Sequence, residues 1–282
     1  MLVKMKSGSG GGGGKAPMYP FATATDAQLA AMLNSYYNGY YDASEITTLK
    51  TTYLPVGAKR SIALSAMAAT GVSESHHADN YDVVIIGQEH DDLSTAIGSK
   101  TKALLTVQLD RILYKNTTDE TYTSSSPSVA DEGGYMNDTA TNVGGWSSCL
   151  RRTWCNDVFY AALPTTLRSC IKPVNKLTGA GNQLTTIVTT QDKVFLLSAV
   201  EVQSTGTAAA DGEGSRYEYF NTSNNRKKKP SYMQAGATSS SSVWWTRSPQ
   251  ISNSKSFVHR KGTNTGTATA DNPKGICPAF CL

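Results

Sequence analysis

The sequence predicts an α+β protein, in which short helices accompany β-strands. Two segments place apolar residues at the three- and four-residue spacing of a helix, one after Thr25 and one after Gly145. Several short runs instead alternate apolar and polar residues or are rich in β-branched residues, which is typical of strands. Stretches rich in Gly, Ser, Thr and Asn separate these strands and indicate loops.

The composition predicts a globular protein with a weakly charged surface. The 282 residues are 39% hydrophobic and include 4 Trp and 14 Tyr, which is enough for one large or two modest domains. Charged residues make up 17%, against about a quarter in an average protein. This polar but weakly charged composition is typical of extracellular and virion proteins built from loops and β-structure.

Positive charge is concentrated at one place only. The formal net charge is +4, and the one dense basic run is Arg226-Lys227-Lys228-Lys229. Such a run either contacts phosphate or an anionic cell-wall polymer, or is a solvated loop. A nucleic-acid-binding protein is expected to show a wider basic face with interleaved aromatic residues. We therefore expect no specific nucleic-acid partner.

Residues 1–16 are predicted to be a flexible tether, because Ser7 to Gly14 is almost entirely glycine and cannot form a core. This tether is either native or an engineered linker. The glycines also stand where a secretory signal has its apolar segment, and no stretch approaches the roughly 20 apolar residues of a membrane helix. We therefore expect neither a secretory leader nor membrane insertion.

Residues 17–54 are predicted to be a helical attachment segment. Thr25 or Asp26 is a suitable N-cap for a helix. Its apolar residues follow at helical spacing: Leu29, Met32, Leu33, Tyr36 and Tyr40. This tyrosine-rich face can pack on the same chain or on a second copy, and its place beside a tether favours a homo-oligomer.

One domain is predicted over residues 55–282, and it begins with strands. Ile62 and Leu64 alternate with polar neighbours, as in a half-buried strand. Val83 to Ile86 is a continuous apolar run, which predicts a strand buried on both faces and paired with the first one. Thr101 to Leu113 continues the strand pattern.

The middle of the chain predicts two helices. Ser147 or Ser148 can cap the first, which runs toward Leu163 and has Leu150 and Trp154 on its apolar stripe. We expect Trp154 to anchor the core. A shorter helix is expected after the proline that ends the first.

The remaining segments alternate strands with long loops. Further strands are expected at Thr185 to Thr190, Val194 to Val202, Val243 to Thr246, Ser256 to Lys261, Thr267 to Ala270 and Ile276 to Leu282. Residues 116–141 and 204–242 are expected to be polar loops, and insertions of that length are often functional.

The strongest candidate for a catalytic or metal-binding motif is His90-Asp91-Asp92. An imidazole and two carboxylates can hold a divalent ion or act in acid–base chemistry. The alternative is that Asp91 or Asp92 caps a turn. His76-His77 is likewise interpreted as loop, and the sequence contains no nucleophile elbow or phosphate-binding loop. We therefore predict no catalytic residue, no cofactor and no metal.

The five cysteines lie at positions 149, 155, 170, 277 and 281. An odd number cannot all pair, and a domain of this size does not need disulfides, so reduced and buried thiols are expected. Cys277 and Cys281 have no second Cys or His pair to complete a zinc site.

The late strands and turns carry the residues that we predict to bind a ligand. They combine hydrogen-bonding, cationic and aromatic side chains: Trp244, Trp245, Arg247, Asn253, Lys255, His259, Lys261 and Asn264. Aromatic faces beside polar groups suit recognition of a saccharide or a protein. The alternative is a tryptophan pair in the core, surrounded by solvated loops.

Ordered motifs in the second half of the chain carry a resemblance to a known family. They are Gly144-Gly145-Trp146, Arg152-Thr153-Trp154-Cys155-Asn156-Asp157, Thr189 to Leu197, Trp244 to Pro249 and Gly275 to Leu282. Together they resemble an uncharacterised domain family of gut Firmicutes and their phages, which is similar to the C-type-lectin-like fold. The resemblance covers residues 144–282 and implies a twisted antiparallel sheet with two flanking helices. Related folds include the variable proteins of diversity-generating retroelements and the sugar-binding lectins, although residues 154–157 fall within a predicted helix and are not expected to bind calcium.

The resemblance implies a virion protein of a phage, assembled in the bacterial cytoplasm and extracellular after lysis. Residues 1–54 would attach it to other virion proteins, and residues 55–282 would project and bind a bacterial surface glycan or protein. No enzymatic activity is expected. The alternatives are a capsid or tail decoration protein that stabilises the particle without a host ligand, and a bacterial surface binding module.

Overall fold

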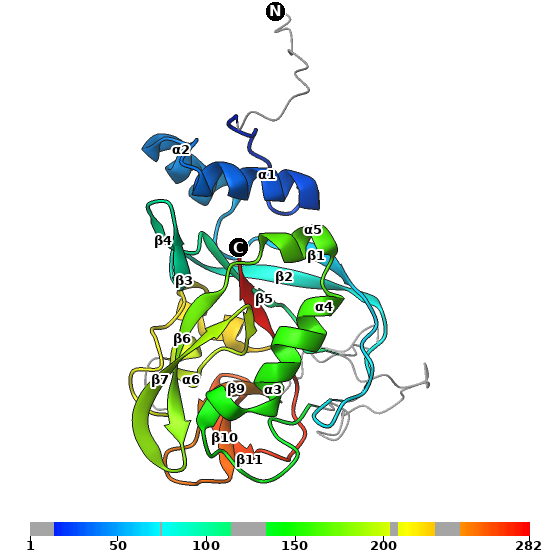
Figure 1. Cartoon of the computed structure of the whole chain (residues 1–282), viewed down its shortest axis with the longest axis vertical. Helices are drawn as coiled ribbons and strands as arrows, with labels where there is room; N and C mark the ends of the chain where they lie inside the picture. The colour runs from blue at the N-terminus through cyan, green and yellow to red at the C-terminus, as the bar shows by residue number, and fades with distance from the viewer. Residues whose placement is uncertain (1–13, 74, 114–133, 204–207, 229–242) are drawn as a thin grey trace, which may run out of the picture.

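The computed structural model describes residues 14–73, 75–113, 134–203, 208–228 and 243–282. It confirms an α+β protein, with three antiparallel sheets and a few short helices (Figure 1). The strands separate into sheets of five, four and three strands, and the finer expectation of a C-type-lectin-like sheet with two flanking helices stays a prediction.

The largest sheet has the strand order β1-β2-β5-β12-β8. Its strands are β1 (Lys59–Leu64), β2 (Asp79–Gln88), β5 (Leu105–Leu109), β12 (Ala279–Cys281) and β8 (Val194–Phe195). β1 and β2 pair as predicted, with Lys59 opposite Val84. Residues Val83 to Ile86 are at most 1% exposed, which confirms burial on both faces. β12 lies between β5 and β8, so the last residues of the chain complete the core.

The second sheet has the order β4-β3-β6-β7. Its strands are β4 (Lys100–Lys102), β3 (Asp92–Ile97), β6 (Val174–Gly181) and β7 (Leu184–Asp192). The turn between β6 and β7 consists of Asn182 and Gln183, whose φ angles are 53° and 62°. Two positive φ values define a type I′ turn, which matches the twist of paired strands. The sequence does not predict β6, because polar Lys176 and Thr178 occupy its buried positions.

The third sheet has the order β11-β10-β9 and confirms the late strands. They are β9 (Val243–Pro249), β10 (Ser256–Lys261) and β11 (Asn264–Thr269). β9 is buried from Trp244 to Pro249, whereas β11 stays partly exposed along its length. The tryptophan pair of β9 is therefore inside the protein.

The N-terminal segment packs on its own chain. α1 (Asp26–Tyr37) begins with a capping box in which the Thr25 side chain accepts a hydrogen bond from the Gln28 amide. Apolar residues of α1 are buried in the main core, and the Tyr37 hydroxyl donates to the Leu282 carbonyl at 2.9 Å. Most of this face is therefore buried within its own chain, although Tyr40 is 38% exposed, and the homo-oligomer stays a prediction.

Short helical segments complete the structure. They are α2 (Ala43–Thr48), the π-helix η1 (Leu49–Tyr53), η3 (Gly145–Ser148), α3 (Leu150–Trp154), the π-helix η4 (Cys155–Phe159), α4 (Tyr160–Ala162), α5 (Thr165–Cys170), α6 (Ala199–Val202), η5 (Glu218–Asn221) and η6 (Ser223–Arg226). Residues 194–202, predicted as a strand, are instead the short β8 followed by α6. α6 forms because Ser198 and Glu201 make a capping box.

The helix formed by α3, η4 and α4 differs from prediction at its start. Its N-cap is Cys149, without a side-chain hydrogen bond, and not Ser147 or Ser148. Leu150 is 40% exposed, whereas the next residue, Arg151, is fully buried. Arg151 is held inside by hydrogen bonds to backbone carbonyls, and its guanidinium lies 4.6 Å from the Trp154 ring centroid. Trp154 itself is buried, as predicted.

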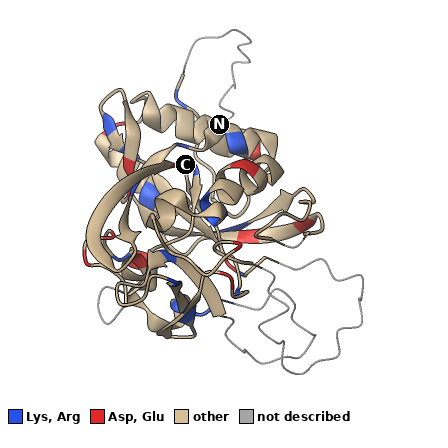
Figure 2. Cartoon of the chain, turned by 60° about the horizontal axis from the view of Figure 1, so that its bottom comes forward, with Lys and Arg blue, Asp and Glu red and all other residues tan. Residues whose placement is uncertain are grey.

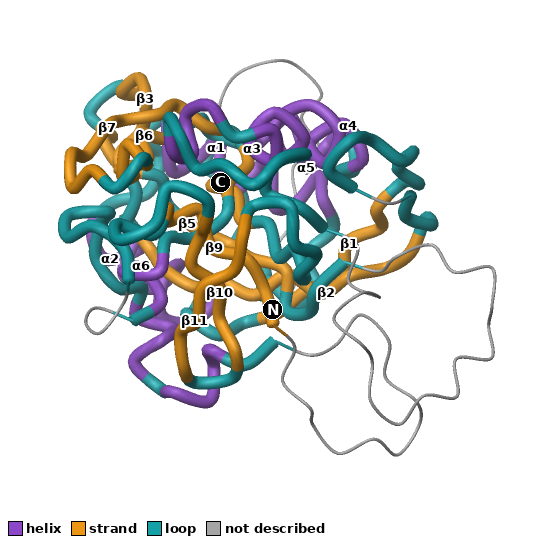
Figure 3. Tube along the Cα trace, turned by 90° about the horizontal axis from the view of Figure 1, so that it is seen from below, coloured by secondary structure: helices purple, strands orange, loops and turns teal. Residues whose placement is uncertain are grey.

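The two ends of the molecule are formed by different elements. Figure 1 shows α1 and α2 at the top and β9, β10 and β11 at the bottom, and Figure 3 shows the loops around these three strands from below. Charged positions of both signs are scattered among uncharged ones (Figure 2). In the described residues, no helix combines the length and the apolar character needed to cross a bilayer.

Candidate functional site

Several residues predicted to bind a ligand lie in the core. Trp244, Trp245 and Arg247 on β9 have no exposed surface, and His259 on β10 is 9% exposed. The Trp245 Nε1 group donates to the Gly134 carbonyl at 2.9 Å. The prediction is therefore corrected for these residues, because β9 runs through the interior and their side chains hold the late strands together.

Three other residues of the same set, Asn253, Lys255 and Asn264, are exposed. Asn253 and Lys255 lie in the loop between β9 and β10, and Asn264 begins β11. Lys261 ends β10 at the position opposite Asn264. These residues remain candidates for contact with a ligand.

The basic run does not form one exposed patch. Lys228 is 2% exposed, and its Nζ group donates to the Leu109 carbonyl at 2.7 Å. Arg226 donates to a backbone carbonyl of its own loop, and Lys227 is exposed. Lys229 lies outside the described residues. Of the described basic residues, Lys228 serves to anchor the loop to β5, which corrects the idea of a uniform polyanion contact.

Asn142 joins three loops at the end where the late strands lie. Its fully buried side-chain amide donates to the carbonyls of Gln250, Asn253 and Ser256, at 3.3, 2.8 and 2.7 Å. Its Oδ1 atom accepts a hydrogen bond from the Asn182 amide at 2.8 Å. One side chain therefore fixes the β9–β10 loop and the β6–β7 turn to its own loop.

Two glycines permit this close approach. Gly145 has a φ of +56°, and a Cβ there would lie 2.0 Å from the Gly179 carbonyl oxygen. Gly181 has a φ of +73°, and a Cβ there would lie 1.8 Å from the Asn142 carbonyl oxygen. Glycine is required at both positions, because any side chain would collide with the neighbouring backbone.

The surface built on this junction combines apolar and polar groups. We call residues 142–145, 182–184 and 250–255 the loop end. Val143 is 55% exposed and Leu184 is 49% exposed, although both are apolar. Such exposed apolar side chains among polar ones are a common feature of binding surfaces, and here the backbone beneath them is held in place.

A small pocket lies elsewhere, beside α3. Its volume is about 210 Å³, and its lining residues are Thr70, Gly71, Val72, Leu150, Thr153, Trp154, Asp157 and Val158. This volume is below the roughly 300 Å³ at which ligand pockets usually begin. The pocket therefore suits a small apolar group at most.

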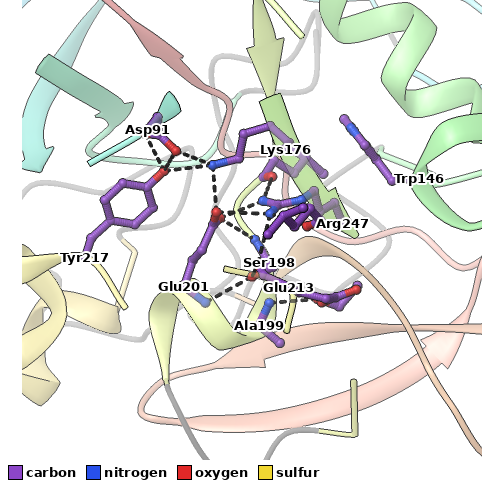
Figure 4. Close-up of polar contacts among 12 residues, drawn as sticks. Asp91, Trp146, Lys176, Ser198, Ala199, Glu201, Glu213, Tyr217 and Arg247 are labelled. Atoms are coloured by element: carbon purple, nitrogen blue, oxygen red, sulfur yellow. Dashed lines mark hydrogen bonds and ion pairs between the residues drawn. The ribbon is translucent and has the colours of Figure 1, made fainter. Parts of the chain in front are cut away.

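The interior contains a cluster of charged side chains (Figure 4). Asp91, Lys176, Glu201 and Arg247 are all at most 4% exposed. Lys176 Nζ lies 2.5 Å from Asp91 Oδ1 and 2.6 Å from Glu201 Oε1, and Arg247 Nη1 lies 2.6 Å from Glu201 Oε2. The Tyr217 hydroxyl lies 3.0 and 2.9 Å from the two Asp91 oxygens. We call these five residues the ion cluster.

Glu213 extends the ion cluster toward β9. Arg247 Nη2 donates to the Glu213 carbonyl at 3.2 Å. The Glu213 carboxylate accepts hydrogen bonds from the Gly179 amide, at 2.6 Å, and from the Ser248 hydroxyl. The segment that carries Glu213 is thus fastened to β6 and β9.

The charges of the cluster compensate one another. Burial alone would raise the pKa of Asp91, but the adjacent Lys176 ammonium and the His90 ring together outweigh it and hold that pKa well below its usual value. Burial would lower the pKa of Lys176, but Asp91 and Glu201 together raise it. Glu213 differs, because burial raises its pKa to about 7 despite the nearby Arg247. The cluster is therefore charged at neutral pH, whereas Glu213 is close to its midpoint of protonation.

The His90-Asp91-Asp92 run does not converge on one point. Asp91 points into the ion cluster, whereas Asp92 is exposed and pairs with Lys102 at 2.8 Å. The His90 ring stacks on Tyr217, with centroids 4.0 Å apart. Among the described residues, no group of three or more His, Cys, Asp or Glu side chains is arranged to hold a metal.

His76 and the cysteines are part of the interior. His76 lies in the loop between β1 and β2, as interpreted, but it is only 3% exposed, and its Nε2 atom lies 3.0 Å from Ser73 Oγ. Burial and the positive charge of Arg151 lower the pKa of His76 to about 4. All five cysteines are unpaired and buried, as expected, and burial raises the pKa of Cys277 to about 11.

Sequence reasoning missed most of the ion cluster. Ser198 and Glu201 have the Ser-x-x-Glu spacing of a capping box, a signal that could have placed Glu201 at a helix start, although the segment is predicted as a strand. Lys176 lies in a strand whose inward positions are polar, and Tyr217 lies in a polar segment. Neither has a local pattern that indicates burial.

Comparison with known proteins gives one result. Residues 109–282, more than half of the chain, match a family described as Domain of unknown function (DUF6273). No curated protein and no solved structure matches the chain.

Proposed function

The chain belongs to the DUF6273 family of domains of unknown function, and we propose that it is a phage virion protein that binds a bacterial surface glycan or protein through its loop end. The observation that carries this proposal is the Asn142 junction. Asn142 fixes three loops to one another, so their exposed side chains keep one arrangement. A preorganised surface loses less conformational entropy when it binds a partner.

The state of the titratable groups favours binding over catalysis. Asp91, Lys176 and Glu201 pair with one another in the interior. Buried side chains that pair with one another hold the sheets together, whereas a catalytic acid or base must be accessible to its substrate. The loop end instead offers Asn253 and Lys255 to solvent, and such hydrogen-bonding groups beside apolar ones suit a sugar or a protein surface.

We also propose a C-type-lectin-like arrangement for the domain. Support comes from the sequence motifs of residues 144–282 and from β12, which closes the largest sheet between β5 and β8. The loop end combines the loop that leads into η3, the β6–β7 turn and the β9–β10 loop. Location on a virion rests on the resemblance of the motifs and on the weakly charged, Gly- and Ser-rich composition.

Residues 1–54 are proposed to attach the domain to other virion proteins. Because the apolar face of α1 is buried, attachment would use the outer side of this segment. The exposed Tyr40, at 38%, is one side chain available there. Figure 1 supports this assignment, since α1 and α2 lie at the end opposite β9, β10 and β11.

A cell-adsorption experiment tests this function. The fluorescently labelled full chain is incubated with intact cells of a panel of gut Firmicutes, with and without protease treatment of the cells. Saturable binding to some strains is expected, and survival of binding after protease identifies a glycan. If no strain binds the chain while it co-sediments with phage particles, the chain is a decoration protein and the adhesion proposal fails.

A further inference from the structure

The ion cluster holds a lysine amine against two carboxylates in a place closed to water. Lys176 Nζ lies 2.5 Å from Asp91 Oδ1 and 2.6 Å from Glu201 Oε1. It also lies 4.3 Å from the centroid of the Phe195 ring and 5.5 Å from that of Tyr217. Aromatic rings and buried neighbours thus surround an amine and a carboxyl group that are already in contact.

The two carboxylates differ in their surroundings. The Tyr217 hydroxyl lies within 3.0 Å of both Asp91 oxygens, and the Thr106 hydroxyl donates to Asp91 Oδ2. Such contacts withdraw electron density from the Asp91 carboxyl carbon and stabilise charge on its oxygens. Arg247 instead pairs with both oxygens of Glu201, which keeps Glu201 an ionised acceptor of protons. Asp91 therefore suits the role of electrophile, and Glu201 that of base.

We propose that Lys176 and Asp91 form an intramolecular isopeptide bond, an amide between Nζ and the Asp91 carboxyl carbon, with Glu201 as proton carrier. One proton passes from the ammonium to Asp91 Oδ1, the free amine attacks the carbon of the neutral carboxyl group, and Glu201 takes a second proton from the nitrogen. The bond from that carbon to Oδ1 then breaks with its electron pair. Oδ1 leaves as water with two of the three ammonium protons, Glu201 returns to its ionised form, and Oδ2 becomes the amide oxygen beside Thr106.

Proximity and exclusion of water make this step feasible without a further reactant. Groups held in reacting geometry behave as if at effective concentrations of about 10⁵ M or more. A buried ion pair also carries a desolvation cost that a neutral amide does not. The bond would join the start of the second sheet to β6 across 85 residues of sequence. This inference does not rest on the proposed function.

Mass spectrometry of the denatured wild-type protein tests the bond directly. The expected intact mass is one water molecule below that of the sequence, and digestion is expected to release a branched peptide that joins Lys176 to Asp91. A mass equal to that of the sequence, with separate linear peptides for the two residues, would overturn the proposal. A branched peptide joining Lys176 to Glu201 would also contradict it.

A cleavage experiment gives a second readout. A protease site is inserted between Asp138 and Thr139, which are exposed and lie between the two bonded positions. After cleavage, denaturation and reduction, the chain is expected to migrate as one species. Lys176→Arg is expected to yield two fragments, whereas the matched Lys172→Arg variant remains one species. Two fragments from the otherwise unaltered chain would reject the bond, whether or not any variant folds.

Discussion

Asn142 illustrates how one buried side chain supports a surface. Replacement by Ala removes the partners of three carbonyls and one amide at the loop end. Unpaired buried polar groups cost about 1–3 kcal/mol each, so we expect Asn142→Ala to lower the free energy of unfolding by about 3 kcal/mol or more.

Chemical denaturation measures this loss. The matched control is Asn264→Ala at an exposed position, for which a change within about 0.5 kcal/mol is expected. Equal effects of the two substitutions would show that Asn142 does not hold the loops.

Glu213 predicts an unusual dependence of stability on pH. Its pKa in the folded protein is about 7, above the ordinary value of 4.5, because burial penalises the charged form. The folded state therefore binds the proton more tightly than the unfolded state, and Glu213 lowers stability progressively as the pH rises from 4.5 to 7. Glu213→Gln is expected to gain up to about 3 kcal/mol relative to wild type between pH 4.5 and pH 8. Denaturation curves across this range test it, and a difference that is constant with pH would contradict the assignment.

At the scale of single elements, the β6–β7 turn has a residue that does not suit it. Gln183 has a φ of +62°, a conformation that costs an L-residue about 1 kcal/mol and that glycine adopts freely. Gln183→Gly is therefore expected to raise the free energy of unfolding by about 1 kcal/mol. Gln191→Gly, the same substitution inside β7, is expected to lower it. Thermal denaturation of both variants tests this prediction. A change of the melting temperature in the same direction for both would contradict the positive φ of Gln183.

α1 is predicted to stabilise the domain on which it packs. Leu29 has no exposed surface, and Leu29→Ala is expected to cost about 3 kcal/mol through lost burial and a residual cavity. Leu150→Ala, at a 40% exposed position of α3, provides the same chemical change and is expected to cost less than about 1 kcal/mol. A small effect at Leu29, measured by denaturation, would show that the helix is not part of the core.

Sequence patterns identified the elements whose local and tertiary preferences agree. The Thr25 cap, the Val83 to Ile86 strand and the buried Trp154 were predicted correctly for that reason. β6 and α6 were missed, because buried Lys176 and Glu201 violate the usual link between polarity and exposure. The ligand residues predicted on β9 were expected at the surface but are buried. The sequence does not reveal this, because Arg247 meets its partner Glu201 only in the folded chain.

At the scale of the whole molecule, two interior features support one surface. The ion cluster links Asp91, near the start of the second sheet, to Lys176 on β6 and Arg247 on β9. The Asn142 junction then fixes the loops beyond those strands. This arrangement places rigid connections inside and exposed side chains outside, as the proposed binding function requires.

The proposal that the loop end binds the bacterial surface is tested by measuring how two surface variants adsorb to bacterial cells. Val143→Asp combined with Leu184→Asp adds charge to the two exposed apolar residues of the loop end, and Tyr40→Asp makes a similar change near the N-terminal helices. The loop-end variant is expected to bind cells at least about tenfold more weakly than wild type, a loss of about 1.4 kcal/mol, while Tyr40→Asp is expected to bind like wild type. Unchanged binding by the loop-end variant, or equal loss in both, would contradict the proposal.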